Sequence, residues 1–247
     1  MTSSPRQASD LAVFVNARRA SRRCPDKMLR PFAGTTVLDL FFAKRPTLDW
    51  PTLHFGAHEP ELIERARGIP GVEVFRRSAE SAASDADPAR IFEILRHLRE
   101  RWVCWINPCH VLLEMATVRR AIDAFLAGDA RSMTAVVPRR GWFFLPDGRP
   151  IDLGSNPVDT AQAGALYEVA HAFHIYESRV LLEHGKPWSG EPGDPALFPI
   201  PAEQAVDIDT EDEFAVAEWR VRRRAKAHDP SGLAPIGASR AREDGSP

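Results

Sequence analysis

The sequence predicts an open α/β fold, with a mostly parallel, doubly wound sheet covered by helices. Short apolar runs alternate with segments of helical periodicity between residues 11 and 137. The apolar runs are nearly continuous, as in strands that are buried on both faces. With 247 residues, 44% of them hydrophobic and 27% charged, the chain is long enough for one such domain with a sizeable core. We therefore expect a single α/β domain over residues 1–225.

The elements follow in order along this domain. Thr35 or Thr36 can cap a first helix, and Gly128 can end the fourth, because these residue types favour the two ends of a helix. Helices are expected at residues 37–43, 60–67, 88–98 and 115–126. Strands are expected at residues 11–15, 52–56, 72–75, 102–106 and 133–137.

The alternation of apolar runs with helical segments ends after residue 138. Proline and glycine interrupt residues 139–199, which indicates an inserted, loop-rich subdomain. Residues 226–247 are rich in Pro, Ser, Gly and charge and have scarcely any large apolar side chains, so we expect a disordered tail.

Composition narrows the function classes. The formal net charge is −2, which argues against the overall basicity of many nucleic-acid-binding proteins. Neither a hydrophobic signal region nor an apolar run near the roughly 20 residues of a membrane span is present. The three cysteines form no Cys-x-x-Cys pair, as is typical of a reducing compartment. We expect a cytoplasmic protein that binds neither nucleic acid nor a membrane.

A basic segment follows the first predicted strand. Residues 16–34 hold six cationic side chains, and ligands of open α/β sheets bind beyond the carboxyl ends of the strands. Arginine forks and a lysine point charge suit phosphate oxygens, so a nucleoside triphosphate is the natural ligand. The alternatives are a solvated surface and non-specific contact with a nucleic-acid backbone. The candidate phosphate contacts are Arg18, Ser21, Arg22, Arg23 and Lys27.

The same segment carries a spaced set of residues: Ala17, Arg18, Ser21, Pro25, Lys27, Leu29, Arg30, Pro31 and Gly34. In this set it resembles the signature of the CMP-sugar-acid synthetases, the acylneuraminate cytidylyltransferases. Residues 205–213 are similar to the aspartate pair of that family, and residues 106–113 take the place of a third family segment. The matches span residues 11–222 in the expected order, and they imply a Rossmann-like nucleotidyltransferase fold.

Asp207 and Asp209 are the candidate metal ligands. Placed at i and i+2 on a strand, their carboxylates would project to one face. Mg²⁺ prefers one or two carboxylates with water and substrate phosphates, and the resemblance implies this cofactor. The alternative is that Asp207 is solvated while Asp209 helps the next helix to start, since Thr210 and Glu213 form a capping box.

The resemblance implies roles for further residues. Arg18, Lys27 and Asp209 are expected to act in catalysis, and the expected nucleotide contacts are Arg18, Ser21, Arg22, Lys27, Arg77 and Ser84. The expected substrate contacts are Asn107, Gln162 and His171. Asn107 can equally satisfy a turn at a strand end, and His171, like His174, can be a packed or surface residue.

Several positions depart from the family pattern. Arg19, Ala20 and Arg23 stand where the family has glycines, so arginine side chains would replace close backbone approach to phosphate. Ala170 and His171 stand where it has Asn-Gly. The departures concentrate on the sugar side, which indicates a changed acceptor.

The sequence therefore predicts a Mg²⁺-dependent cytidylyltransferase that transfers CMP from CTP to an acidic sugar, such as a sialic-acid-like nonulosonic acid, and releases pyrophosphate. The resemblance also implies a homodimer, in which the inserted subdomain reaches the neighbouring site. Two alternatives stay open. One is a glycosyltransferase that uses its Asp-x-Asp pair on a nucleotide sugar, and the other is a degenerate relative that only binds.

Overall fold

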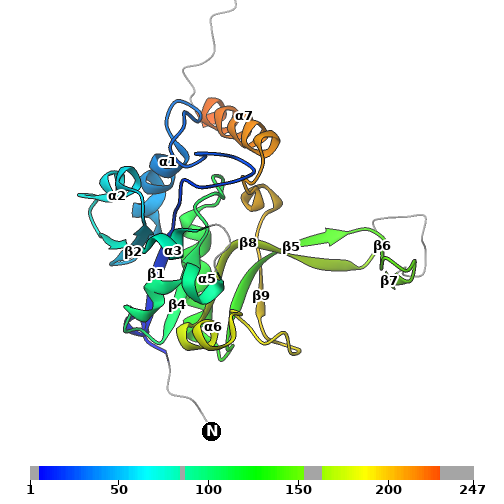
Figure 1. Cartoon of the computed structure of the whole chain (residues 1–247). Coiled ribbons are helices and arrows are strands. Elements are labelled where there is room, and N and C mark those ends of the chain that lie inside the picture. The colour runs from blue at the N-terminus through cyan, green and yellow to red at the C-terminus, as the bar shows by residue number, and fades with distance from the viewer. Residues whose placement is uncertain (1–5, 84–86, 153–162, 229–247) are drawn as a thin grey trace, which may run out of the picture.

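A seven-stranded sheet forms the centre of the protein (Figure 1). The computed structural model describes residues 6–83, 87–152 and 163–228. The strand order is β3-β2-β1-β4-β8-β5-β9, and all neighbours are parallel except those of β8, which runs antiparallel to β4 and β5. The strands are β1 (Leu11–Asn16), β2 (Leu53–Ala57), β3 (Val72–Arg76), β4 (Trp102–Ile106), β5 (Met133–Arg140), β8 (Ala165–Glu177) and β9 (Ala196–Pro199).

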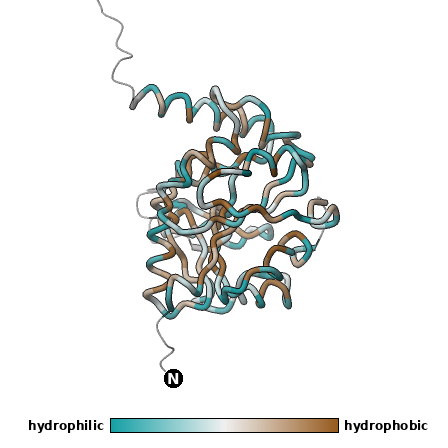
Figure 2. The backbone as a smooth tube through the Cα atoms, turned by 90° about the vertical axis from the view of Figure 1, so that its left-hand side faces the viewer, coloured by the Kyte–Doolittle hydropathy of each residue, from teal (hydrophilic) through white to brown (hydrophobic). Residues whose placement is uncertain are grey.

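Helices cover both faces of this sheet, as a doubly wound fold requires. On one face Phe41 and Phe125 join the main core, and on the other Ile94 and Leu181 pack with Phe14. The α-helices are α1 (Val37–Lys44), α2 (Pro60–Ala66), α3 (Ala79–Ala82), α4 (Pro88–Ile91), α5 (Met115–Ala127), α6 (Ser178–His184) and α7 (Glu211–His228). Short 3-10 helices are η1 (Ala8–Asp10), η2 (Arg45–Leu48), η3 (Glu93–Arg96) and η5 (Ala202–Ala205). Figure 2 shows the apolar stretches gathered in the central strands.

The predicted fold class is confirmed, and most predicted elements occur within a few residues of their expected bounds. The helix predicted over residues 88–98 is wrong in its length. It ends at Ile91, and η3 follows after Phe92, whose ring packs edge-on against Phe14 and Trp105. A continuous helix would require helical dihedral angles at Phe92. The observed angles are φ −101° and ψ 33°, so the backbone bends at this residue.

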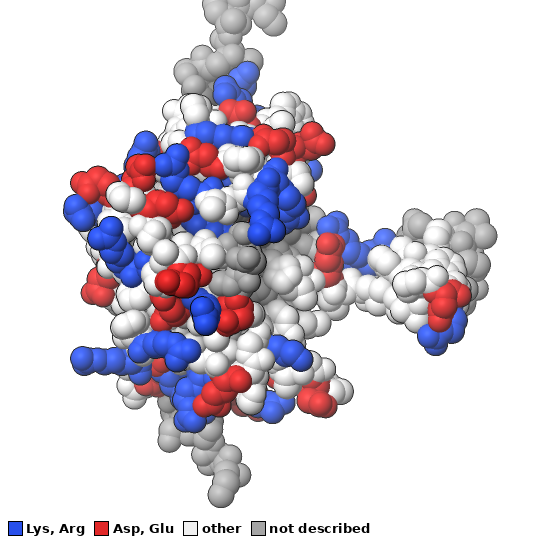
Figure 3. Space-filling model, in the orientation of Figure 1, with Lys and Arg blue, Asp and Glu red and all other residues white. Residues whose placement is uncertain are grey.

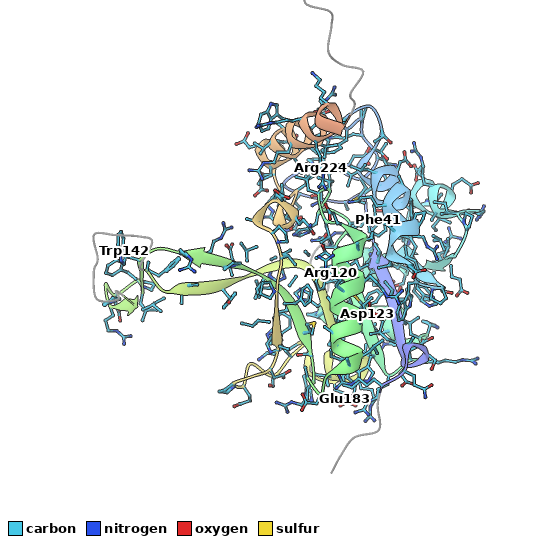
Figure 4. All side chains as sticks on the ribbon, turned by 180° about the vertical axis from the view of Figure 1, so that it is seen from behind. Phe41, Arg120, Asp123, Trp142, Glu183 and Arg224 are labelled. Atoms are coloured by element: carbon cyan, nitrogen blue, oxygen red, sulfur yellow. The ribbon has the colours of Figure 1, made fainter. Side chains whose placement is uncertain are left out.

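The prediction of a loop-rich subdomain at residues 139–199 is wrong for its second part. β8 and β9 belong to the central sheet, and α6 packs on it. The first part does leave the sheet. β5 and β8 continue outward as a two-stranded arm, and the short strands β6 (Phe143–Phe144) and β7 (Pro150–Asp152) pair at its tip (Figure 1). Figure 4 shows Trp142 at this far end.

Two further expectations need correction. Residues 206–209, which carry the aspartate pair, are not a strand but an extended connection between η5 and α7. Helix α7 runs to His228, so it extends into the segment predicted as a tail. The rest of that segment, residues 229–247, lies outside the described residues. No helix among residues 6–83, 87–152 and 163–228 is long and apolar enough to span a membrane.

Candidate nucleotide site

A pocket of about 470 Å³ lies at the carboxyl ends of β1 and β4. Its walls are the loop after β1, the α3–α4 segment, the residues after β4 and Asp209. Figure 3 shows basic side chains gathered on the face below α7, over the loop that follows β1. The sequence-predicted residues that line the pocket are Arg18, Ser21, Arg22, Arg23, Lys27, Arg77, Asn107 and Asp209. Eight residues from distant parts of the chain thus meet in one place.

Ion pairs and a hydrogen bond within the loop and to the start of α2 hold the loop after β1. The Arg19 backbone N–H donates to the Glu59 carboxylate at 2.7 Å, and its guanidinium pairs with Asp26 and Glu61 at 2.8 and 2.7 Å. Asp26 adopts a left-handed backbone conformation (φ 55°), which aspartate tolerates better than most residues. Arg19 stands where the resembled family has glycine, and its side chain serves the loop instead of the pocket.

Lys27 and Arg23 both contact Asp209. Lys27 Nζ lies 3.3 Å from Asp209 Oδ1 and also donates to the Ile208 carbonyl, while Arg23 lies 2.8 Å from Asp209 Oδ2. Burial opposes the charge of Lys27, but Cys109, Asp209 and Asp207 outweigh it and raise its pKa. Burial likewise opposes the charge of Asp209, but Lys27 and Arg23 lower its pKa below the ordinary value. Lys27 and Asp209 are therefore both charged at neutral pH.

The remaining loop residues are less engaged. Arg18 donates to the Ala83 carbonyl at 3.1 Å, and the Ser21 backbone N–H donates to the Arg19 carbonyl at 2.8 Å. Arg22 has no hydrogen bond or ion pair within the described part of the chain, although it lines the pocket. Its guanidinium is available to an anion.

Arg77 is used inside the protein. It is 3% exposed, and it donates to the Ala17 carbonyl and to both the hydroxyl and the carbonyl of Ser81. Burial lowers its pKa to about 10, so it stays protonated at neutral pH. The structure thus places Arg77 at the pocket wall as a support of the loop. Ser84, predicted on the nucleotide side, lies outside the described residues.

Asn107 connects the end of β4 to the aspartate segment. Its Nδ2 lies 3.4 Å from Asp207 Oδ2, and its Oδ1 accepts a hydrogen bond from the Cys109 N–H at 3.1 Å. Asp207 Oδ1 accepts the Ile208 N–H at 2.8 Å. Asn107 therefore closes a turn at the end of β4 and also touches the candidate metal ligand, and its expected contact with substrate stays a prediction.

Asp207 and Asp209 offer the hard oxygen donors that Mg²⁺ prefers. Substrate phosphates and water would have to complete the coordination, because no group of three or more His, Cys, Asp or Glu side chains suited to a metal occurs among the described residues. The donor set fits a magnesium ion that binds together with a nucleotide. It does not fit zinc, which usually has four protein or substrate ligands of softer character.

Comparisons with known proteins find similar cytidylyltransferases. The chain is 25% identical over 223 residues to N-acylneuraminate cytidylyltransferase B of zebrafish (Danio rerio). Its fold matches a CMP:2-keto-3-deoxy-manno-octonic acid synthetase complexed with CTP, with a TM-score of 0.63 and 11% identity over 87% of this chain and 99% of the other. The chain is thus similar in sequence to an N-acylneuraminate cytidylyltransferase and shares the fold of a CMP-sugar-acid synthetase.

Two further solved structures share the fold of this chain. The 4-diphosphocytidyl-2C-methyl-D-erythritol synthase of Anaerococcus prevotii matches 88% of this chain and all of its own, with a TM-score of 0.60 and 9% identity. A cytidylyltransferase of Leptospira borgpetersenii matches 88% of this chain and 95% of its own, with a TM-score of 0.53 and 16% identity. The alignment with the zebrafish protein covers 86% of this chain and about half of the relative, 51%. No protein-family model matches.

The predicted sugar-side residues do not lie where the sequence analysis expected them. Gln162 lies outside the described residues. His171 does not line the pocket. It lies on β8, and its ring is 3.2 Å from His174, which stacks on the pocket residue Trp105.

Sequence reasoning missed His110 and the aromatic wall of Phe92 and Trp105. His110 is buried beside the aspartate segment, with Nε2 2.8 Å from the Ala170 carbonyl and Nδ1 3.8 Å from Asp207 Oδ1. Burial lowers its pKa, so its neutral form is favoured. A histidine inside the third matched segment was a signal in the sequence. The wall carried none, because Phe92 was assigned to a continuous helix.

Proposed function

We propose that this protein is a Mg²⁺-dependent cytidylyltransferase that transfers CMP from CTP to an acidic sugar and releases pyrophosphate. The supporting observation is that the basic loop after β1 and the Asp209 carboxylate face one pocket at the carboxyl end of the sheet. The likeness to named cytidylyltransferases supports CTP as the nucleotide.

In this proposal the triphosphate replaces the pairing that now joins the loop to Asp209. Arg18, Arg22 and Lys27 contact the β and γ phosphates and neutralise the charge that develops on departing pyrophosphate, and Ser21 donates a hydroxyl hydrogen bond. Asp207 and Asp209 hold Mg²⁺, which supplies charge neutralisation at the phosphate oxygens. The aromatic wall of Phe92 and Trp105 limits water in the pocket.

The test is pyrophosphate release with Mg²⁺ and each of the four NTPs, against sialic, legionaminic, pseudaminic and ketodeoxyoctonic acids. We expect release with CTP and at least one acid. Asp209→Asn should lower kcat by about 100-fold or more, because the carboxylate is the candidate metal ligand. Asp212→Asn is the matched control, since Asp212 lies in the first turn of α7 with no hydrogen bond or ion pair among the described residues. It should retain full activity.

Other outcomes separate the alternatives. CTP binding without pyrophosphate release under any combination favours a protein that only binds. Hydrolysis or transfer of a nucleotide sugar, with no release from CTP, favours the glycosyltransferase. An Asp209→Asn variant with full CTP turnover contradicts the metal assignment.

We also propose a homodimer. The arm formed by β5 and β8 leaves the sheet and exposes large apolar side chains near its tip, including Phe144 and Tyr167 at 58% and 49% exposure. The resemblance implies that this region reaches a neighbouring subunit. A cytoplasmic location stays a prediction, supported by three buried cysteines that are all free.

A further inference from the structure

Along the carboxyl edge of the sheet, the parts of the candidate site follow one another in the order of the strands. The basic loop follows β1, Asn107 follows β4 and touches Asp207, and the next strand along is β8. β8 reaches this edge at Ala172, whose carbonyl accepts the Asn107 N–H at 2.9 Å. In phosphoryl transfer the attacking and leaving oxygens lie roughly in line across the phosphorus. With pyrophosphate leaving on the side of the basic loop, the second substrate approaches from the side of β8.

His171 occupies β8 at that point. It has a left-handed backbone conformation (φ 52°), which is uncommon for a residue with a side chain, and the β5–β8 register shifts beside it. The resembled family has glycine here, so the sequence keeps a glycine-like backbone and adds an imidazole. Such strain persists only where the surrounding structure fixes it. The ring is exposed and therefore open to a ligand.

A buried chain of hydrogen bonds fixes the ring of His171. Thr134 is fully buried on β5, with Oγ1 2.7 Å from His174 Nδ1, and His174 Nε2 lies 3.2 Å from His171 Nδ1. His174 is held by Trp105, stacked with an interplanar angle of 18° and ring centroids 5.4 Å apart. Burial lowers the pKa of His174 to about 3, so this ring carries one proton at neutral pH.

The proton positions follow from the buried hydroxyl. A buried O–H needs an acceptor, and His174 Nδ1 is the partner of Thr134 Oγ1 within the described residues. His174 therefore carries its proton on Nε2 and donates it to His171 Nδ1. With Nδ1 of His171 accepting, Nε2–H is the donor that this ring offers to a ligand.

We propose that His171 is a specificity-determining residue whose Nε2–H binds the carboxylate of the acidic acceptor, and that His174 and Thr134 are positioning residues that fix this tautomer. The inference rests on the proposed function for its substrate. A hydrogen bond to a charged partner is worth about 1.5–3 kcal/mol, or roughly 10-fold to 100-fold in affinity. An uncharged ester of the acceptor would not receive this gain.

The first experiment needs no turnover. Long-range ¹H–¹⁵N correlation spectra of the full chain report which ring nitrogen carries the proton, with His171→Gly and His174→Gln used for assignment. We expect Nε2–H in both rings. A proton on Nδ1 of His174 or of His171 overturns the proposal.

The second experiment compares each acid with its methyl ester, using N-acetylneuraminic acid and 2-keto-3-deoxy-manno-octonic acid. His171→Gly suits the left-handed backbone, so the thermal midpoint should stay equal or rise. We expect this variant to raise KM for the acid about 10-fold, to leave KM for CTP unchanged and to remove the preference for acid over ester. Equal KM values for the acid in wild type and variant overturn the proposal.

A matched pair of variants at Thr134 tests the positioning residues. Thr134→Val removes the hydroxyl and should raise KM for the acid roughly 3-fold, whereas Thr134→Ser keeps the hydroxyl and should keep KM. If no acid supports turnover, the proposed function fails, and binding decides the inference separately. A shift of the His171 Nε2 signal with the acid but not with the ester supports it, and no shift with either overturns it.

Discussion

Every nitrogen of the Arg77 guanidinium donates within the protein, to the Ala17 carbonyl and to the hydroxyl and carbonyl of Ser81. The resemblance of the sequence to a known family had implied that this arginine contacts the nucleotide. The contacts show that this arginine holds Ala17, the residue from which the basic loop departs. Burial and the number of internal acceptors separate a supporting arginine from a binding one, and a sequence shows neither.

Arg77→Met should therefore act through stability. Loss of the buried donors leaves the Ala17 and Ser81 carbonyls without partners, and we expect the free energy of unfolding to fall by about 2–4 kcal/mol. Urea denaturation measures this change. Arg76→Met is the control, because its side chain is exposed on the neighbouring residue of β3. Equal stability of the two variants would show that Arg77 does not support the loop.

His174 should make stability depend on pH. Its folded-state pKa of about 3 lies below the ordinary value of 6.5, so the unfolded chain binds the proton more readily between these values. The stability that neutral His174 contributes is complete above pH 6.5 and is lost as the pH falls toward 3.

Between pH 7.5 and pH 5 this loss amounts to about 2 kcal/mol, at 1.36 kcal/mol per pKa unit. The free energy of unfolding of His174→Gln should therefore fall less than that of wild type over this interval, by about that amount. Parallel pH profiles of the two proteins would contradict the buried neutral state of His174.

At the scale of elements, strands with one pattern of burial and a turn at each end were predictable. Strands that run from the buried sheet into the exposed arm were not. β4 begins and ends where its apolar run does. β8 is buried from Ala172 to Tyr176 but largely accessible where it forms the arm, so it shows no single periodicity. The aspartate segment was assigned to a strand from its alternating pattern. Its residues instead bond to Lys27 and to each other, and within the described part of the chain they belong to neither sheet.

The candidate site also has a part that could be predicted from the sequence and a part that could not. The basic loop and the aspartate pair could be found because their spacing resembles a family signature, and the pocket brings Lys27 and Asp209 together. The pairing of His171 with His174 could not, because it depends on an irregular register between β5 and β8. Contacts across a bulge leave no pattern in one sequence.

The capping box at the start of α7 is confirmed, since the Glu213 N–H donates to Thr210 Oγ1 at 3.3 Å and the Glu213 carboxylate accepts the Thr210 N–H at 2.9 Å. The same carboxylate accepts the Asp209 N–H at 3.0 Å, so the cap also holds a candidate metal ligand. Thr210→Ala should lower the free energy of unfolding by about 1 kcal/mol, and Thr210→Ser should restore most of it. Thermal unfolding of the pair measures this, and equal midpoints for all three proteins would contradict the cap.

At the scale of the whole molecule, the arm leads to a prediction about assembly. We expect sedimentation velocity to show a dimer and the double variant Phe144→Ser, Tyr167→Ser to be monomeric, because both side chains expose apolar surface on the arm. Trp219→Ser is the control, since Trp219 is also 58% exposed but lies on α7. A monomeric wild type, or a dimer that the double variant does not weaken, would contradict a dimer formed through the arm.

The place of β8 in the sheet has a consequence for how the chain folds. β4 lies between β1 and β8, and its first residue, Trp102, pairs with Glu177, so the sheet becomes continuous only after a long stretch of chain has been made. β5, made earlier, has its place on the far side of β8 and cannot join β1–β4 alone. Such pairing between distant segments slows folding, because the chain loses conformational entropy on closing the loop before the stabilising contacts form. The first four strands can associate early, and the second half of the sheet then docks as a unit built around β8.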